Sequence, residues 1–254
     1  MHHASQEPTQ DLYNRHTHLW IRKEPTILSD YTARPRVLES VGTVDGLDIL
    51  DLGCGEGYLS RALYERGAAS VMGLDISEQM VRAANEQNAH DGYQIVYETR
   101  DLRNWQPPKA QFDRAIAVFL FNYLNLQDSM SVLTHCRRAL KDDGELVLTL
   151  PHPSLPWLRA AEAPFYFERP SLPYRGARDM RLKGRIWQRA GQSVPVVCFH
   201  KTMEDIFRLL SEAGFSRVLE FNELYVTDEH KAIDPLFFGP LEGTPLHILV
   251  KVAQ

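Results

Sequence analysis

Residues 49–57 read Ile49-Leu50-Asp51-Leu52-Gly53-Cys54-Gly55-Glu56-Gly57, and this stretch decides the fold. Its apolar beginning predicts a buried strand, and its glycines predict a tight turn that lets backbone approach a ligand closely. The residues that follow, 58–65, have the apolar spacing of a helix. A strand, a glycine-rich turn and a helix N-terminus in this order predict a binding site for a nucleotide-like ligand.

The rest of the chain repeats this alternation of apolar runs and helical segments, which is typical of a parallel sheet with helices on its faces. We therefore predict an α/β fold with a doubly wound, seven-stranded, mostly parallel sheet whose last two strands form an antiparallel edge. The predicted strands are 47–52, 70–76, 93–98, 112–119, 144–150, 217–221 and 246–252.

The pattern indicates one domain over residues 1–254 with two additions. Residues 1–40 are predicted to form an N-terminal helical lid, because Leu12, Tyr13, Leu19 and Trp20 have partial helical spacing. The second addition, 151–198, is rich in prolines, which argue against a long helix or a central strand there. We interpret it as an inserted, substrate-binding cap.

Composition excludes several classes of protein. The chain is 44% hydrophobic with a mean hydropathy of −0.32, which is ordinary for a soluble globular protein. Its net charge of −5 argues against non-specific binding to nucleic acid. The longest apolar run, 115–121, is far too short to span a membrane. The sequence does not indicate an oligomeric state.

The three cysteines have no CxxC spacing, which predicts free thiols and a reducing compartment, the cytoplasm. Cys54 lies in the glycine turn without an apparent base beside it, so a nucleophilic role is disfavoured. His2 and His3 lie in a polar terminus, and we expect no metal site.

The glycine pattern also narrows the class of ligand that the turn can bind. In a dinucleotide fingerprint the third glycine stands one position later, where this chain has Tyr58. Asp51 ends the strand before the turn, where it can accept a hydrogen bond from a cationic or donor-rich ligand. Asp75 ends the second predicted strand, beside the first turn, and its two oxygens suit the hydroxyls of a ribose. Read alone, Asp75 could instead cap a helix, and the turn could be purely structural.

A third acid follows the third predicted strand. Asp101 can accept a hydrogen bond from an exocyclic amine, and Ile76 and Leu102 can enclose a flat base between them, which together describe adenine. The alternative is that Asp101 simply begins a short helix.

In this order, the motifs resemble the class I S-adenosylmethionine-dependent methyltransferases over about the first 150 residues. The resemblance rests on the glycine motif, on Asp75, on Asp101-Leu102, and on the strand that ends in Phe121-Asn122-Tyr123-Leu124. It implies a Rossmann-like methyltransferase fold, S-adenosylmethionine as cofactor and methyltransferase activity.

The resemblance also implies roles for residues. The three glycines Gly53, Gly55 and Gly57 would line the methionine part of the cofactor, Asp75 would hold its ribose, and Ala117 and Val118 would lie beneath it. Apart from the resemblance, Tyr31 and Arg34 are close to the glycine turn in the sequence and could reach the methionine carboxylate, although packing is the better explanation for Tyr31. The full set of candidate cofactor-binding residues is Asp51, Gly53, Gly55, Gly57, Asp75, Ile76, Met80, Asp101, Leu102, Ala117, Val118, Tyr31 and Arg34.

Methyl transfer needs mainly a well-positioned acceptor, so a base is useful without being essential. The candidate bases are His152 after the fifth strand, Tyr123 after the fourth, and His200. His152 ranks first by position, against the alternative that Pro151-His152-Pro153 is only a rigid turn.

The acceptor is expected to be a small molecule, methylated on nitrogen or oxygen. The chain lacks the Asn/Asp-Pro-Pro-aromatic motif of methyltransferases that act on adenine bases or glutamine. Residues 159–189 carry eight basic and three acidic side chains, which favours a carboxylate or another anion on the substrate unless these arginines are simply solvated or paired. The alternatives are an RNA or protein methyltransferase and a non-catalytic, cofactor-binding accessory protein.

Overall fold

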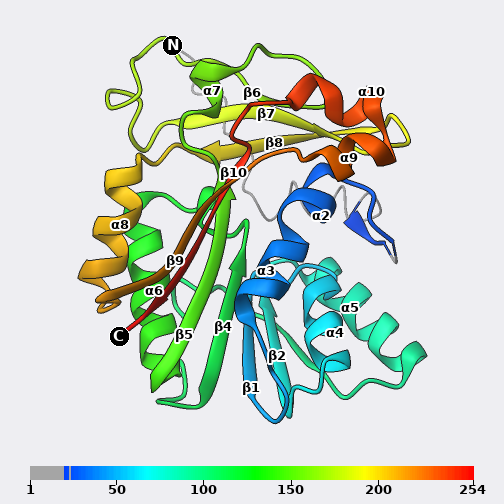
Figure 1. The fold of residues 1–254 in the computed structure, drawn as a ribbon. Helices are drawn as coiled ribbons and strands as arrows, with labels where there is room; N and C mark the ends of the chain where they lie inside the picture. Colours follow the sequence, from blue (N-terminus) through cyan, green and yellow to red (C-terminus); the bar gives the residue numbers. More distant parts are fainter. Residues whose placement is uncertain (1–19, 23) are drawn as a thin grey trace.

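The structure is a computed structural model that describes residues 20–22 and 24–254. The predicted lid residues Leu12, Tyr13 and Leu19 lie outside this part, as do His2 and His3. The described chain forms a seven-stranded sheet with helices on both faces and a second, three-stranded sheet above one edge (Figure 1).

The large sheet has the predicted topology. Neighbouring strands from β3 to β5 run parallel, and β10 pairs antiparallel with both β5 and β9. The α/β fold class and the antiparallel edge are therefore confirmed. The strands, in spatial order, are β3 (Val96–Thr99), β2 (Ser70–Asp75), β1 (Asp48–Leu52), β4 (Phe112–Val118), β5 (Leu140–Pro151), β10 (His247–Ala253) and β9 (Arg217–Leu224).

Strand β5 begins four residues earlier than predicted. Phe112 pairs with Leu140, and the register then shifts, so that Arg114 pairs with Glu145. The irregular pairing keeps Leu140 in the sheet directly after a helix that ends at Ala139, which the apolar pattern alone did not show.

Two layers of helices bury the two faces of this sheet. One layer packs buried aliphatic side chains of α3 (Arg34–Val41), α4 (Tyr58–Glu65) and α5 (Glu78–Asp91) against it. The opposite layer consists of α6 (Leu126–Ala139) and α8 (Met203–Glu212). Burial of these apolar stripes is the main force that holds the helices on the sheet.

The start of α5 shows why the chain turns where it does. Ser77 is the N-cap, and its hydroxyl accepts a hydrogen bond from the amide of Met80. The helix ends at Gly92, which has a φ of +74°. The preference of serine for N-caps predicted this start.

The insertion contains more regular structure than its prolines indicated. It forms an antiparallel sheet of β6 (Phe165–Phe167), β7 (Arg181–Trp187) and β8 (Ser193–Phe199). Pro195 lies within β8, which is an edge strand, and an edge strand tolerates the missing amide hydrogen. The other prolines of the insertion lie outside these three strands.

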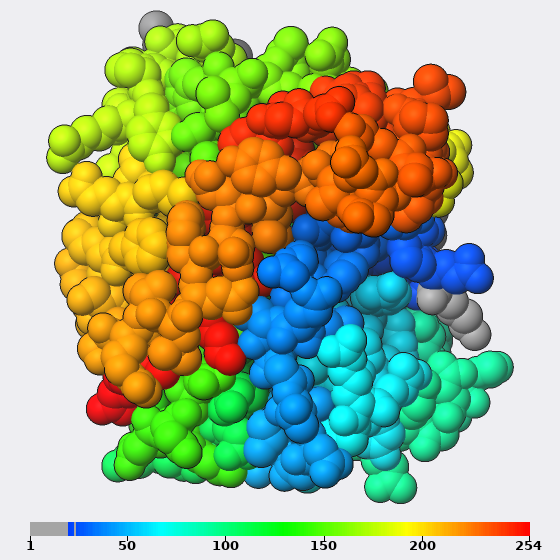
Figure 2. Space-filling view, viewed as in Figure 1, coloured from blue at the N-terminus to red at the C-terminus, as the bar shows by residue number. Residues whose placement is uncertain are grey.

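This small sheet lies over the carboxyl ends of the parallel strands (Figure 1). A separate apolar cluster joins it to Leu28, Leu155, Phe238 and Leu246. On the face drawn in Figure 2, the segment around α9 and α10 lies directly above the N-terminal helices. The short helices are α2 (Leu28–Thr32), α7 (Leu155–Leu158), α9 (Asp228–Ile233), α10 (Pro235–Phe238), and the 3-10 helices η1 (Phe121–Tyr123) and η2 (Gly239–Leu241). No helix in the described ranges is long and apolar enough to cross a membrane.

The glycine at the start of α4 yields a stability prediction. Gly57 has a φ of +83°, and a Cβ there would lie 2.7 Å from Cζ of Tyr97. Gly92 has a similar φ of +74°, but a Cβ there would meet nothing within 4 Å. Gly57→Ala should therefore cost clearly more than the about 1–2 kcal/mol of left-handed strain expected for Gly92→Ala. Urea unfolding of both variants checks this, and equal losses would contradict the packing described around Gly57.

Candidate active site

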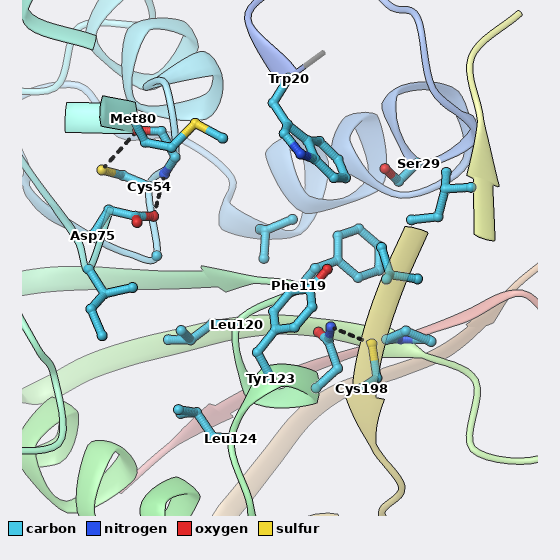
Figure 3. Close-up of a pocket in the computed structure, with 18 of the residues that line it drawn as sticks. Trp20, Ser29, Cys54, Asp75, Met80, Phe119, Leu120, Tyr123, Leu124 and Cys198 are labelled. Carbon is cyan, nitrogen blue, oxygen red and sulfur yellow. Dashed lines mark hydrogen bonds between the residues drawn. The ribbon is translucent and has the colours of Figure 1, made fainter. Parts of the chain in front are cut away.

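A cavity of about 460 Å³ lies between the carboxyl edge of the large sheet and the small sheet. One half is lined by the turn after β1 and the ends of β2 and β3, and the other half by β6, β7 and β8. Figure 3 shows Cys54, Asp75 and Met80 on one side of the cavity and Phe119, Tyr123 and Cys198 on the other. A continuous cavity thus connects the glycine motif to the insertion.

The glycine turn is fixed by the neighbouring strand. The amides of Gly53 and Cys54 both donate to the carbonyl of Leu74, at 2.8 and 3.1 Å. The amide of Gly55 donates to Oδ2 of Asp75 at 2.9 Å. Gly53 and Gly55 have φ values of +73° and +56°, a conformation that favours glycine. A Cβ on Gly55 would meet nothing within 4 Å, so the backbone of this turn is open to a ligand.

The third glycine of the motif contributes to packing and does not contact the cavity. Gly57 does not line the cavity, because it begins α4 and packs against Tyr97. Ala117 is also fully buried away from the cavity, whereas the next residue, Val118, lines it.

Asp75 holds the turn and still faces the cavity. Its Oδ1 accepts from the amide of Ser77 at 2.8 Å, while Oδ2 accepts from Gly55. Burial raises the pKa of this carboxyl, and the backbone donors act against that rise. Each carboxylate oxygen can accept a further hydrogen bond, so the pair of oxygens remains available to a diol.

Three other predicted positions, Ile76, Met80 and Leu102, line the cavity beside Asp75. Asp101 lines it as well, but Arg103 holds its carboxylate in a bidentate ion pair at 2.8 and 2.7 Å. These hydrogen bonds lower the pKa of Asp101.

Asp51 is the most electrostatically unusual group of the site. It is 3% exposed, and its Oδ2 accepts a hydrogen bond from Oγ of Ser60 at 2.6 Å. Burial raises the pKa of Asp51 to about 7, the nearby charge of Asp75 adds to the rise, and Arg34 acts against it. A cationic group of a ligand in this half of the cavity would stabilise the Asp51 carboxylate.

An ion-pair network joins the segment before α2 to the glycine turn. Arg34 lines the cavity and pairs with Asp30 at 2.8 Å. Arg22 pairs with the same Asp30 at 2.9 Å and reaches Glu56 of the glycine turn at 3.4 Å. Trp20 also lines the cavity (Figure 3). The network therefore holds the beginning of the described chain against the site.

Tyr31 does not line the cavity. Its hydroxyl donates to the carbonyl of Pro25 at 2.8 Å, and its ring packs on Phe238 at 5.3 Å between centroids. The packing interpretation of Tyr31 therefore applies.

The structure separates the three candidate bases. Tyr123 lines the main cavity (Figure 3), whereas His152 and His200 line a much smaller one of about 30 Å³. Nε2 of His152 lies 2.9 Å from Oε1 of Glu223, because the backbone after β5 stays paired with Leu246 and directs the ring toward β9. We therefore do not retain His152 as the favoured base.

His200 is held in the same small cavity. Its Nε2 lies 2.9 Å from the carbonyl oxygen of Tyr174, and its ring packs on Trp157 at 4.9 Å between centroids. Burial lowers the pKa of His200. These contacts explain its position structurally, and it too is not retained as a base.

A buried lysine positions the loop that carries Tyr123. Nζ of Lys201 donates to the carbonyl of Phe121 at 2.8 Å and also to that of Leu124. Burial lowers the pKa of Lys201 to about 8. No pattern in the sequence connects this residue with a loop that lies about 80 positions away.

Sequence reasoning also missed His247, the first residue of β10. It lines the cavity, is 2% exposed, and lies between the rings of Phe119 and Phe165, at 5.0 and 5.6 Å between centroids. The one signal in the sequence is a histidine that begins an otherwise apolar strand.

Two basic residues of the insertion form ion pairs with acids of α8. Arg175 pairs with Glu204 at 3.7 Å and Arg178 with Asp205 at 2.5 Å, so the alternative of pairing with acids elsewhere applies to both. Arg181 lines the cavity.

The described residues favour neither a nucleophilic cysteine nor a metal site. All three cysteines are free thiols, as predicted, and all three are buried. Burial raises the pKa of the Cys54 thiol well above its usual range, which disfavours a thiolate nucleophile. Within the described ranges, no group of three or more histidine, cysteine, aspartate or glutamate residues could hold a metal ion.

Comparison with known families and proteins gives a consistent result. Residues 49–144 match the family model of a methyltransferase domain. The chain is 30% identical over 191 residues to the demethylmenaquinone methyltransferase of Lactococcus lactis, covering 73% of this chain and 72% of that protein. It is 35% identical over 104 residues to the ubiquinone biosynthesis O-methyltransferase of Idiomarina loihiensis, covering 40% of this chain and 41% of that protein. An uncharacterised protein of Haemophilus influenzae is 28% identical over 137 residues, so the chain spans only about half the length of some relatives (53% in this case).

Solved structures share the fold. An S-adenosylmethionine-dependent methyltransferase from Mesorhizobium loti has a TM-score of 0.64 and 24% identity, with 87% of this chain and 96% of that chain covered. The magnesium protoporphyrin IX methyltransferase of Synechocystis PCC 6803, solved with bound SAH, has a TM-score of 0.60 and 19% identity, with 96% and 97% covered.

The raised pKa of Asp51 predicts how stability depends on pH. In the folded chain its pKa is raised from 3.8 to about 7. Between these values the folded state holds a proton that the unfolded state has lost, so a rise in pH toward 7 costs stability, at most about 4 kcal/mol. The stability advantage of Asp51→Asn over the wild type should thus grow between pH 5 and pH 8, by about 2–3 kcal/mol, as measured by urea unfolding without ligand. The same stability difference at both pH values would contradict the assignment.

Proposed function

Because the chain belongs to the class I S-adenosylmethionine-dependent methyltransferases, we propose that it transfers a methyl group to a small-molecule acceptor held beneath the insertion, residues 151–198. The observation that carries the proposal is the continuous cavity that links the glycine turn and its acids to the small sheet. A cavity covered by a sheet fits a small acceptor better than a macromolecule.

The half of the cavity next to β1 and β2 fits the cofactor. Asp75 has two oxygens that can each accept another hydrogen bond, as a ribose diol requires. The flat base would lie between Ile76 and Leu102, with Asp101 toward its amine. Met80 extends the apolar wall beside the base.

The methionine part would lie along the turn at Gly53 and Gly55, where the backbone of Gly55 is open. Its ammonium would face the buried carboxylate of Asp51. Within the described chain, Arg34 is the cation whose charge acts on Asp51. Its carboxylate would face Arg34, which lines the cavity. When bound, the cofactor supplies a methyl group activated by a positively charged sulfur.

The other half of the cavity fits an organic acceptor with a ring. Its walls include Phe165, Phe167 and Ile186 of the small sheet, together with Phe119 and Tyr123. Such aromatic side chains favour flat, apolar ligands. Two relatives have names that refer to ubiquinone biosynthesis and to demethylmenaquinone, which supports a quinone-related acceptor. Of the two names, only that of the ubiquinone biosynthesis O-methyltransferase supports oxygen as the methylated atom.

Positioning and exclusion of water would carry most of the rate. The lined cavity would hold the acceptor in one orientation, and well-oriented reactants can gain about 7–11 kcal/mol over reactants free in solution. Arg181, an arginine of the insertion that lines the cavity, would bind an acidic substituent of the acceptor.

Replacement of the ribose-binding acid tests the cofactor half. Asp75→Ala should weaken binding of S-adenosylhomocysteine by at least about tenfold, because a hydrogen bond to a charged group contributes about 1.5–3 kcal/mol. Glu86→Ala, an exposed position on the neighbouring helix α5, is the control and should bind as the wild type does. Titration calorimetry measures both, and an unchanged affinity in the Asp75 variant would remove this residue from the site.

Turnover tests the proposed activity itself. Purified protein with S-adenosylmethionine and a panel of hydroxylated aromatic compounds should release S-adenosylhomocysteine together with a product heavier by one methylene, both detected by mass spectrometry. Release of S-adenosylhomocysteine with RNA or protein alone would favour a macromolecular acceptor. Cofactor binding without any release would indicate a non-catalytic protein.

A further inference from the structure

The acceptor half of the cavity contains two buried polar side chains whose hydrogen-bonding capacity is not used. Neither ring nitrogen of His247 has a hydrogen-bond partner within the described part of the chain, and the same is true of Oδ1 of Asn122. The two residues are 2% and 4% exposed, and both line the main cavity. A buried polar group without a partner destabilises the protein, so its retention requires an explanation.

The topology explains how His247 reaches the site. Strand β10 runs antiparallel to β5, so its first residue lies opposite Pro151, where β5 ends. His247 thereby lies at the same edge of the sheet as the turn after β1, although nearly 200 residues separate the two. The rings of Phe119 and Phe165 pack against the imidazole and restrict its orientation.

Asn122 reaches the same cavity from η1. Its Nδ2 donates to Sγ of Cys198 in β8 at 3.3 Å, and this contact leaves Oδ1 as the unused acceptor. Figure 3 draws the bond to Cys198 beside Tyr123 and Phe119. The loop that bears Asn122 is itself held by Lys201. Both polar groups are thus fixed before any ligand arrives.

Burial, together with nearby positive charge, keeps the imidazole of His247 neutral. Burial lowers the pKa of His247 to about 3, and Arg34 and His152 act in the same direction. A neutral imidazole has one nitrogen that donates and one that accepts, which suits an uncharged hydroxyl. An ammonium group bound at His247 would lie near the positive charge of Arg34, which acts on this histidine, so a cationic amine is disfavoured at that position.

We propose that His247 and Asn122 bind the hydroxyl group of the methyl acceptor, and that the acceptor is a phenol whose ring packs against the aromatic wall of the small sheet. The inference rests on the proposed function and deepens it by naming the acceptor class and the residues that recognise it. The hydroxyl would accept from the protonated imidazole nitrogen and donate to Oδ1 of Asn122, which can only accept. This arrangement satisfies one ring nitrogen and the amide oxygen, which are otherwise buried without partners.

Nitrogen NMR on the full chain tests the contact directly. Protein labelled with ¹⁵N-histidine is first saturated with S-adenosylhomocysteine and then titrated with catechol. The imidazole resonances of His247, assigned from the His247→Phe variant, should shift on addition of catechol, while those of the exposed His90 should not. Benzylamine, a cation of similar size, should produce no shift.

Binding to variants provides a second readout. His247→Phe keeps a flat ring without hydrogen bonds, and it should weaken catechol binding by about tenfold, as expected for one lost hydrogen bond. His247→Gln retains a donor and an acceptor and should recover part of the loss. His90→Gln is the surface control. All three variants should bind S-adenosylhomocysteine within about twofold of the wild type, which also reports that they fold.

The outcomes separate the two levels of the account. If S-adenosylhomocysteine does not bind the wild type, the proposed function itself fails. If it binds but catechol does not, or if benzylamine binds equally well, the phenol assignment is overturned. If catechol binds without a shift of the His247 resonances and with equal affinity in His247→Phe, the role of His247 is overturned while the cofactor site stands.

Discussion

The site depends on the tie between the ends of two neighbouring strands. The turn after β1 would be an unsupported loop without the carbonyl of Leu74, which accepts from two consecutive amides, and the carboxylate of Asp75, which accepts from a third. These bonds fix a left-handed backbone that only glycine adopts readily. They also place a half-buried carboxylate at the centre of the proposed cofactor site. The same acid therefore builds the turn and faces the ligand.

Two further elements convert this edge into an enclosed cavity. The ion pairs of Arg22 with Asp30 and Glu56 hold the beginning of the described chain against the glycine turn. The small sheet covers the carboxyl edge from above and supplies the aromatic wall of the acceptor half (Figure 1). Burial disfavours the charged form of Asp51 in one half of the cavity and of His247 in the other. Both side chains lie where a bound ligand could offer the partner that burial has removed. These two groups cost stability in the unbound protein and favour binding, as is common at functional sites.

The sequence predicted the fold and most of the cofactor half because those features are local. A strand, its turn and the acid at the next strand end follow one another within residues 47–77, and period and turn chemistry are sufficient to locate them. The proposed cofactor residues Asp51, Asp75 and Leu102 accordingly line the cavity. Gly57 was assigned to the cofactor by the family resemblance and Tyr31 by its proximity to the glycine turn in the sequence, and packing directs both elsewhere.

The acceptor half could not be predicted in the same way because its residues come together only through long-range pairing. His247 reaches the cavity through the antiparallel register of β10 with β5, and Lys201 reaches its loop across the fold. His152 follows a strand that does end at the correct edge, but its side chain is directed toward Glu223 by the neighbouring strand. The strands of the insertion were hidden by prolines that lie mainly in its connections.

A crystal structure of the protein grown with S-adenosylhomocysteine tests the central claim most directly. The account predicts that the ribose hydroxyls lie within hydrogen-bond distance of Asp75 and that the amino-acid tail lies along Gly53 and Gly55, with the half of the cavity beneath β6–β8 left for the acceptor. A nucleoside bound elsewhere, or crystals in which this cavity holds none of it at saturating concentration, would contradict the account.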